Sequence, residues 1–239
     1  ALASHPQIKP GDPILTEQPN LEITIESEAA RFNLNALLRT EDQVVLPRIL
    51  RAWGLDLEQA QALQNAMQDW IDEDDLVRLT GAESEIYAEA GFPNRPFNRP
   101  FRSLDEVALV RGMEHVRVDW QNWLTLWSRT GKLDVNDAPA ELISVLCDCS
   151  IESAESFITY RDGPDTIPNS IDDPAIQSVD ELTSLLGVPV EETLVAFNDS
   201  ISRVTCVARL EDHARKRQVV LQRGASRVQL YHWKEEIIP

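Results

Sequence analysis

The sequence predicts an α+β protein with a large, mostly helical segment inserted between a first pair of strands and a carboxy-terminal antiparallel sheet. Three observations support this fold class. Apolar residues alternate with period two over residues 21–35, they alternate again after residue 198, and helix-starting signals fill the interval. The 239 residues, 43% of them apolar, are enough for one large domain or two smaller ones.

The inserted segment contains one supersecondary unit twice. Residues 31–35 (RFNLN), here called the first box, are similar to residues 132–136 (KLDVN), the second box, which lie 101 positions later. The preceding Ile-Thr-Ile over 23–25 is likewise matched by Leu-Thr-Leu over 124–126. Downstream, Ser-Leu-Asp-Glu at 103–106 corresponds to Ser-Val-Asp-Glu at 178–181. The sequence separation between corresponding residues of the two copies decreases along the chain. The first copy is therefore longer, and most of its extra length lies between Ile71 and Arg102.

The first elements are an arm and two strands. Residues 1–20 contain four prolines, at positions 6, 10, 13 and 19, which prevent a continuous helix or a central strand. This part is predicted to be a linker or extended arm. The alternation over residues 21–35 predicts two strands joined near Ala29-Ala30 as a small hairpin.

Helices follow, and four sequence patterns mark their starts. Each pattern has a residue able to accept a hydrogen bond from a free backbone N–H group, with an acidic or amide residue three positions on. The patterns are Thr40-x-x-Gln43, Asp56-x-x-Gln59, Ser103-x-x-Glu106 and Ser178-x-x-Glu181. After Asp56, a stripe that includes Met67 and Trp70 falls on one helical face, and we interpret it as core packing.

Three strands are predicted at the carboxyl end, over residues 201–210, 218–221 and 227–233, with polar turns at 211–217 and 224–226. Strands in this order form an antiparallel meander. One face is apolar and could cover a helix that lies upstream of this sequence. Its predicted members are Val204, Cys206, Ala208, Val219, Leu221, Val228, Leu230 and His232.

These elements divide the chain into three parts. Residues 1–35 form the arm and first strands, residues 36–197 form the inserted helical domain, and residues 198–239 form the carboxy-terminal sheet. The two related units inside the insertion run over about 31–113 and 132–187.

Composition and motifs disfavour several function classes. The formal net charge is −18, from 40 acidic against 22 basic residues, so a phosphate backbone would be repelled except at a locally basic face. Neither G-x-S-x-G nor H-E-x-x-H is present, and the four histidines are scattered singly, so we expect no enzyme, no catalytic residues and no cofactor-binding residues. The three cysteines allow at most one internal disulfide and include no C-x-x-C pair.

One nucleic-acid alternative stays open, because repeated strand and helix units can resemble helix-hairpin-helix modules. Those modules bring glycine-rich turns against phosphate. The corresponding turns here, residues 54–56 (GLD) and 148–150 (DCS), are acidic and mostly lack glycine. DNA contact is therefore the less favoured reading.

The sequence contains no membrane-spanning stretch. Its longest apolar runs have only a few residues, far below the roughly 20 needed to cross a bilayer, and it opens with Ala1 without a signal-peptide pattern. We expect a soluble piece of a trimmed or processed chain, with any membrane anchor upstream.

Several segments together resemble a known family. They are residues 69–75 (DWIDEDD), 81–83 (GAE), Tyr87, Pro96, Asn98, 100–101, 103–107 (SLDEV), 111–112 and the second box at 132–139 (KLDVNDAP). In this order and spacing they resemble the K-type minor pseudopilins of bacterial type II secretion, the GspK family, over roughly residues 21–233. Asp134 and Asp137 depart from the family's usual Asn and Thr.

The resemblance implies a pilin-like fold, with a long amino-terminal helix packed on the carboxy-terminal sheet and a helical domain inserted between the first strand and that sheet. It implies a non-enzymatic protein cleaved by prepilin peptidase and held by a single span in the inner membrane, with this part in the periplasm. The family is placed at the pseudopilus tip, where it starts or caps assembly with the I and J minor pseudopilins and supports export of folded proteins across the outer membrane. Secreted substrates are further candidate partners.

The extra segment of the first copy, between Ile71 and Arg102, is rich in acidic residues and is here called the acidic insertion. It is the best candidate site for a metal ion. Asp72, Asp74, Asp75, Glu83 and Glu85 concentrate oxygen ligands, and calcium prefers six to eight oxygens. An EF-hand is excluded, because Leu76 and Val77 occupy a ligand position and the required glycine position. The resemblance implies structural calcium in this domain, so we expect Asp72, Asp74 and Glu83 to bind it, with Glu85 and Asn98 as further candidates. The alternative is a solvated acidic loop.

Overall fold

The computed structural model describes residues 20–128, 131–165, 173–210, 213–223 and 227–238. The arm predicted over residues 1–20 lies almost wholly outside these residues. The chain forms two compact units, one of residues 31–126 and one that joins residues 1–30 to residues 127–239. These boundaries differ from those of the predicted insertion over 36–197, which stays a prediction.

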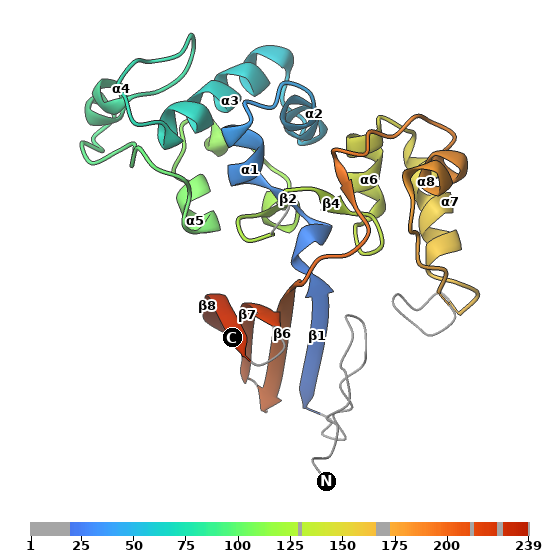
Figure 1. Cartoon of the computed structure of the whole chain (residues 1–239). Coiled ribbons are helices and arrows are strands. Elements are labelled where there is room, and N and C mark those ends of the chain that lie inside the picture. Colours follow the sequence, from blue (N-terminus) through green and yellow to red (C-terminus); the bar gives the residue numbers. More distant parts are fainter. Residues whose placement is uncertain (1–19, 129–130, 166–172, 211–212, 224–226, 239) are drawn as a thin grey trace. The chain divides into compact units, whose positions relative to one another are not determined.

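The unit that joins residues 1–30 to residues 127–239 contains a sheet of four antiparallel strands in the order β1-β6-β7-β8 (Figure 1). The strands are β1 (Leu21–Ser27), β6 (Ile201–Leu210), β7 (His213–Arg223) and β8 (Val228–Ile238). Their register aligns Ile25 with Val204, Val204 with Val219, and Val219 with Trp233. The predicted meander is confirmed. Its middle strand begins five residues earlier than predicted, because His213 pairs with β6 and the polar stretch from Ala214 pairs on both sides despite its charge.

A β-bulge in β8 changes which residues face which side. Val220 pairs with His232, but the neighbouring Leu221 pairs with Leu230, so Tyr231 is an extra residue in the ladder. The predicted place of His232 on the apolar face was therefore wrong. Trp233 takes that face, whereas His232 lies on the opposite one and stacks on Trp127 at a ring separation of 4.4 Å.

The same unit contains a helical part. It consists of η1 (Glu28–Ala30), β4 (Leu133–Asp134), α6 (Ala140–Cys147), α7 (Ile151–Arg161), α8 (Val179–Leu186) and β5 (Val195–Ala196). β4 and β5 pair in parallel, and Leu142, Phe157 and Leu182 fill the core between the helices. Glu28 and Arg203 form a buried two-point ion pair, with Arg203 Nε at 2.8 Å from Glu28 Oε2, which ties η1 to β6.

The unit of residues 31–126 is mainly helical. Its elements are β2 (Phe32–Asn33), α1 (Leu34–Arg39), α2 (Val45–Ala52), α3 (Leu57–Ile71), α4 (Ser84–Glu89), α5 (Leu104–Val107), η2 (Met113–His115), η3 (Trp120–Asn122) and β3 (Leu124–Thr125). Trp70 lies at the centre of its core. The indole stacks on Phe101 at 6.0 Å and meets Tyr87 edge-on at 5.5 Å. The stripe is confirmed as core at Ala60, Leu63, Met67 and Trp70, whereas Leu57, predicted on the same helical face, is 71% exposed.

Three of the four predicted helix starts are confirmed. Asp56 and Gln59 form a reciprocal capping box, and the hydroxyls of Ser103 and Ser178 accept from the backbone N–H groups three residues on. Thr40 was the exception, because it ends α1. The next helix begins at Val45, where the Asp42 carboxylate accepts from the N–H group of Leu46 at 2.8 Å.

The predicted hairpin over residues 21–35 was wrong. β1 pairs with β6, and β2 pairs in parallel with β3 instead. The intervening η1 turn separates the two strands, and each finds its partner far along the chain. For the same reason, residues 23–25 and 124–126 are not structural counterparts, although their sequences are similar.

Candidate metal centre

The site lies where α3 ends and the acidic insertion begins. Asp69 occupies the last turn of α3 and is fully buried, and Asp72 caps the carboxyl end of the helix in an extended conformation. The chain then runs through an exposed loop to Gly81 and Glu83, immediately before α4. These few residues bring carboxylates from both ends of the loop together.

Asp69 organises the return of the loop. Its carboxylate accepts from the backbone N–H groups of Ala82 at 2.9 Å and Arg78 at 3.2 Å, and from the guanidinium Nη1 of Arg78 at 2.9 Å. A side chain at Gly81 would place its Cβ only 2.0 Å from Asp69 Oδ2, so the close approach requires glycine.

Glu83 is the most unusual group of the site. Only 3% of the residue is exposed, yet among the described residues neither carboxylate oxygen has a hydrogen-bond partner. One oxygen each from Asp69, Asp72 and Glu83 lie within 4.8 Å of one another. Burial, and then the nearby carboxylates beginning with Asp69, raise the pKa of Glu83 to about 7.

Two further oxygens in this region have no hydrogen-bond partner among the described residues. They are Asp72 Oδ1 and Asn98 Oδ1, and both atoms are buried. Burial also raises the pKa of Asp72, although its hydrogen bond with Arg78 opposes the change. Buried oxygens without partners are costly, and a cation that accepts them as ligands removes that cost.

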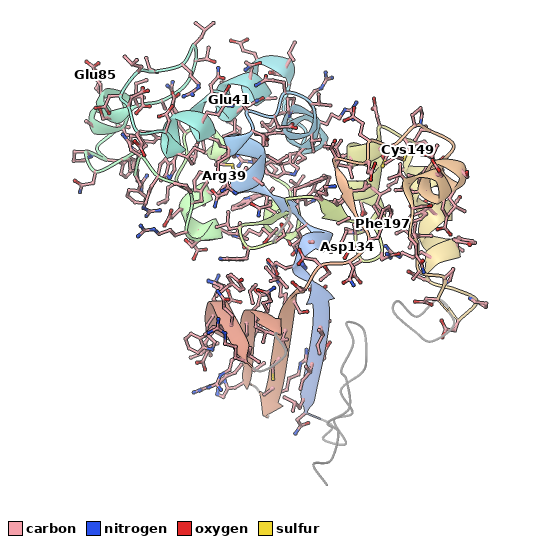
Figure 2. The ribbon with its side chains drawn as sticks, viewed as in Figure 1. Arg39, Glu41, Glu85, Asp134, Cys149 and Phe197 are labelled. Atoms are coloured by element: carbon pink, nitrogen blue, oxygen red, sulfur yellow. The ribbon has the colours of Figure 1, made fainter. Side chains whose placement is uncertain are left out.

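The five predicted ligands are placed differently by the structure. Asp72 and Glu83 lie in the cluster, whereas Asp74 is exposed and its carboxylate accepts from the N–H group of Leu76 at 2.8 Å. Asn98 is half-buried and donates to the carbonyl of Asp74 at 3.4 Å. Glu85 is exposed on the first turn of α4 (Figure 2). It is not part of the cluster.

Sequence reasoning missed Asp69. The available signal was a carboxylate directly beside Trp70, one turn after Ala66, on the buried stripe of an amphipathic helix. A charged residue in such a stripe needs a partner.

The donor set fits a hard cation. Three clustered carboxylates, with an amide oxygen and exposed carbonyls on the neighbouring loop, offer the oxygen ligands that calcium prefers, and none is a soft sulfur or imidazole ligand. When bound, calcium would supply positive charge that links the two ends of the insertion.

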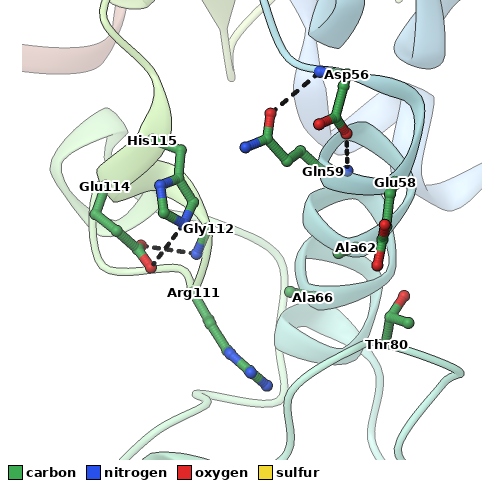
Figure 3. A pocket seen from close by; sticks show the side chains of 10 residues that line it. All are labelled: Asp56, Glu58, Gln59, Ala62, Ala66, Thr80, Arg111, Gly112, Glu114 and His115. Carbon is green, nitrogen blue, oxygen red and sulfur yellow. Dashed lines mark hydrogen bonds and ion pairs between the residues drawn. The ribbon is translucent and has the colours of Figure 1, made fainter.

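A shallow pocket lies elsewhere in the same unit, between the start of α3 and the η2 region (Figure 3). Asp56 and Gln59 line it, but their side chains already form the capping box. Glu114 accepts from the N–H group of Gly112 at 2.7 Å and lies 3.8 Å from the ring of His115. Asp56, Gln59 and Glu114 therefore serve the local fold.

Three comparisons with known proteins place the chain. The family model described as type II secretion system protein K matches residues 30–120, nearly the whole unit that holds the carboxylate cluster. Type II secretion system protein K of Pseudomonas aeruginosa is 28% identical over 156 residues, which are 62% of this chain and 46% of that protein. Over residues 30–120 the chain is similar to the type II secretion protein K family.

Other relatives carry the same description. Protein K of Klebsiella pneumoniae is 31% identical over 100 residues, which are 38% of this chain and 31% of that protein. Protein K of Pectobacterium carotovorum is 29% identical over 106 residues. The chain therefore spans less than half the length of the curated relatives it matches.

A solved structure shows the fold over nearly the whole chain. A chain in the crystal structure of the GspK-GspI-GspJ complex of enterotoxigenic Escherichia coli matches with a TM-score of 0.70 at 16% identity, covering 94% of this chain and 83% of that one. The chain thus shares with that protein a mixed α and β architecture with an antiparallel sheet. No described helix is both long and apolar enough to cross a bilayer.

Proposed function

We propose that this chain is the periplasmic part of a minor pseudopilin that sits at the tip of the type II secretion pseudopilus, assembles with the I and J minor pseudopilins, and starts or caps the filament. In this role it is not an enzyme, and it supports export of folded proteins from the periplasm across the outer membrane. The supporting observation is that the family match and the match to a chain of the GspK-GspI-GspJ complex fall on the same molecule.

The apolar sheet face supports the pilin-like part of this proposal. Leu230, Trp233 and Ile237 are 60%, 54% and 70% exposed and lie on one face of the sheet, where Trp233 continues a row that includes Ile25 and Val219. A hydrophobic helix upstream of this sequence would cover that face and anchor the protein in the inner membrane by a single span. Residues 36–197, with their two related units, are then the helical insertion in a pilin-like domain.

Co-purification tests the assembly role. The chain is mixed with the soluble parts of the I and J minor pseudopilins, and the mass is measured by light scattering with and without calcium. We expect a stable one-to-one-to-one complex. A chain that stays monomeric with both partners in calcium would contradict the proposal. Retention on DNA that falls with added salt would instead favour the helix-hairpin-helix alternative, which no comparison supports.

We further propose that calcium is a structural ligand of the carboxylate cluster. The support is the set of buried oxygens without partners on Glu83, Asp72 and Asn98, which carboxylate-bound calcium would satisfy. Asp69 joins Asp72 and Glu83 as an expected ligand, Asn98 and Asp74 are outer candidates, and Glu85 is the weakest.

Calcium at millimolar concentration is expected to raise the melting temperature of the chain, and a chelator is expected to reverse the rise. Glu83→Gln should abolish most of this shift, because it removes a buried charge of the cluster. Glu85→Gln is the matched control, since it makes the same chemical change two residues away on an exposed side chain. An unchanged melting temperature for the unmodified chain would end the calcium proposal.

A further inference from the structure

Arg78 occupies a place in the carboxylate cluster that neither the fold nor the family resemblance explains. It lies on the exposed loop between α3 and α4, but its side chain turns back to the end of α3. The guanidinium Nη1 donates to Asp69 Oδ1 at 2.9 Å and also to Asp72 Oδ2. Nη2 lies 3.9 Å from Glu41 Oε1 at the outer side of the group.

The charges of the cluster are only partly balanced by this arginine. Asp69, Asp72 and Glu83 carry three negative charges when ionised, and Arg78 is the cation in contact with two of them. Two negative charges remain in excess, and Arg78 forms no hydrogen bond to Asp72 Oδ1 or to either carboxylate oxygen of Glu83. A divalent cation would balance this excess.

The guanidinium of Arg78 and a bound divalent cation would therefore interact with the same carboxylates. Arg78 engages Asp72 Oδ2, while Asp72 Oδ1 has no hydrogen-bond partner among the described residues. Two cations that share one carboxylate repel each other, so each weakens the binding of the other. Without the metal ion, the same guanidinium holds the loop against α3 by offsetting the repulsion between Asp69 and Asp72.

We propose that Arg78 is an internal counter-ion of the metal site, which keeps the acidic insertion folded when no divalent cation is bound and lowers the affinity of the site for calcium. The inference rests on the proposed calcium site and adds to it a residue that sets the affinity. Arg78 acts as a positioning residue through Asp69 and Asp72, and it is not itself a ligand.

Calcium titration by isothermal calorimetry tests the proposal with Arg78→Gln. We expect the dissociation constant for calcium to fall about tenfold, because a competing positive charge is removed from the site. The melting temperature in chelator should fall, and calcium should recover most of the loss. Arg209→Gln is the control, since it also removes one positive charge and one ion pair, with Glu22, but on the sheet. It should leave the affinity unchanged.

The outcomes separate this proposal from the calcium site itself. If the unmodified chain binds calcium and Arg78→Gln binds it no more tightly, the counter-ion role is overturned while the site stands. If neither binds calcium, both fall. A purely structural Arg78 would lower the melting temperature equally with and without calcium.

A second measurement uses the unmodified chain and does not depend on the variant folding. The guanidinium N–H signals of Arg78 are followed by nuclear magnetic resonance during a calcium titration. We expect their exchange with water to become faster as calcium binds, because the ion weakens the hold of Asp69 and Asp72 on the guanidinium. Exchange that stays equally slow at saturating calcium would overturn the proposal.

Discussion

Two buried carboxyl groups have pKa values raised well above those of exposed carboxyl groups. Glu83 lies in the metal cluster, and Asp134 lies in the second box, where it accepts from the N–H group of Asn136 at 3.1 Å and from the Ser27 hydroxyl at 3.4 Å. Burial, followed by the charge of Asp137, raises the pKa of Asp134 to about 7, as burial does for Glu83. The folded state therefore keeps two protons that the unfolded state releases at lower pH.

The sign of the resulting pH dependence follows from linkage. Between about pH 4.5 and 7 the folded chain binds more protons at these two groups than the unfolded chain does, so their contribution to the free energy of unfolding falls as pH rises. We expect the melting temperature of the calcium-free chain to fall across this window. Glu83→Gln and Asp134→Asn should each flatten the fall, and Glu85→Gln should not. Thermal melts at closely spaced pH values measure this, and an unchanged slope in both variants would refute it.

At the scale of elements, the two boxes use one asparagine in the same way. Asn35 accepts from the N–H group of Phe101 at 3.0 Å and donates to its carbonyl at 2.9 Å. Asn136 makes the same pair of bonds to Ile176, at 2.9 and 3.0 Å, and a further one to Phe197. In both copies the bonded residue lies two positions before the serine that caps the next helix. In each copy, the hydrogen bonds of this asparagine therefore fix the position at which the helix, α5 or α8, begins.

Loss of either asparagine should destabilise only its own unit. Asn35→Ala leaves buried backbone groups of Phe101 unpaired, and we expect a loss of about 2–4 kcal/mol in the stability of residues 31–126. Asn136→Ala should do the same to the other unit. Hydrogen exchange resolved by residue distinguishes the two, and Asn122→Ala, at an exposed position, is the control. Equal loss of protection in both units would contradict the assignment.

At the scale of the whole molecule, the apolar sheet face is the surface on which we expect a further hydrophobic helix to pack. Trp233→Asp replaces a residue that is half exposed here, so we expect little change, about 1 kcal/mol or less, in the stability of this chain. In a chain extended by an upstream hydrophobic helix, the same change should lower the melting temperature by several degrees. Gln229→Asp, on the opposite face, is the control. An equal effect of both variants in the extended chain would contradict helix packing on this face.

The sequence predicted local features and the carboxy-terminal meander well, but it predicted the long-range strand pairs poorly. The capping residues Asp56, Ser103 and Ser178 were readable, because a cap is a bond between neighbours three residues apart. The partner of β1 was not readable, since β6 lies about 180 residues further along the chain and period two says nothing about pairing. The bulge at Tyr231 could not be predicted from the sequence either, and it moves His232 to the face opposite to the predicted one.

The candidate site divides in the same way. Asp72 and Glu83 were identifiable from the sequence, because clustered carboxylates in one loop are a local pattern. Glu85 belongs to the same pattern and yet lies outside the cluster, whereas Asp69 and Arg78 lie inside it.

By itself, the sequence determined the α+β class, the repeated box, three of the four predicted helix starts, the carboxy-terminal meander and the concentration of carboxylates in the acidic insertion, since each depends on residues close together in the chain. Only the tertiary structure decided the long-range strand pairs, the face on which His232 lies and the membership of the carboxylate cluster. The physical reason is that burial and charge proximity depend on how a loop returns to its helix. Here the buried carboxylate of Asp69 sets that return, at the one position where glycine permits the approach.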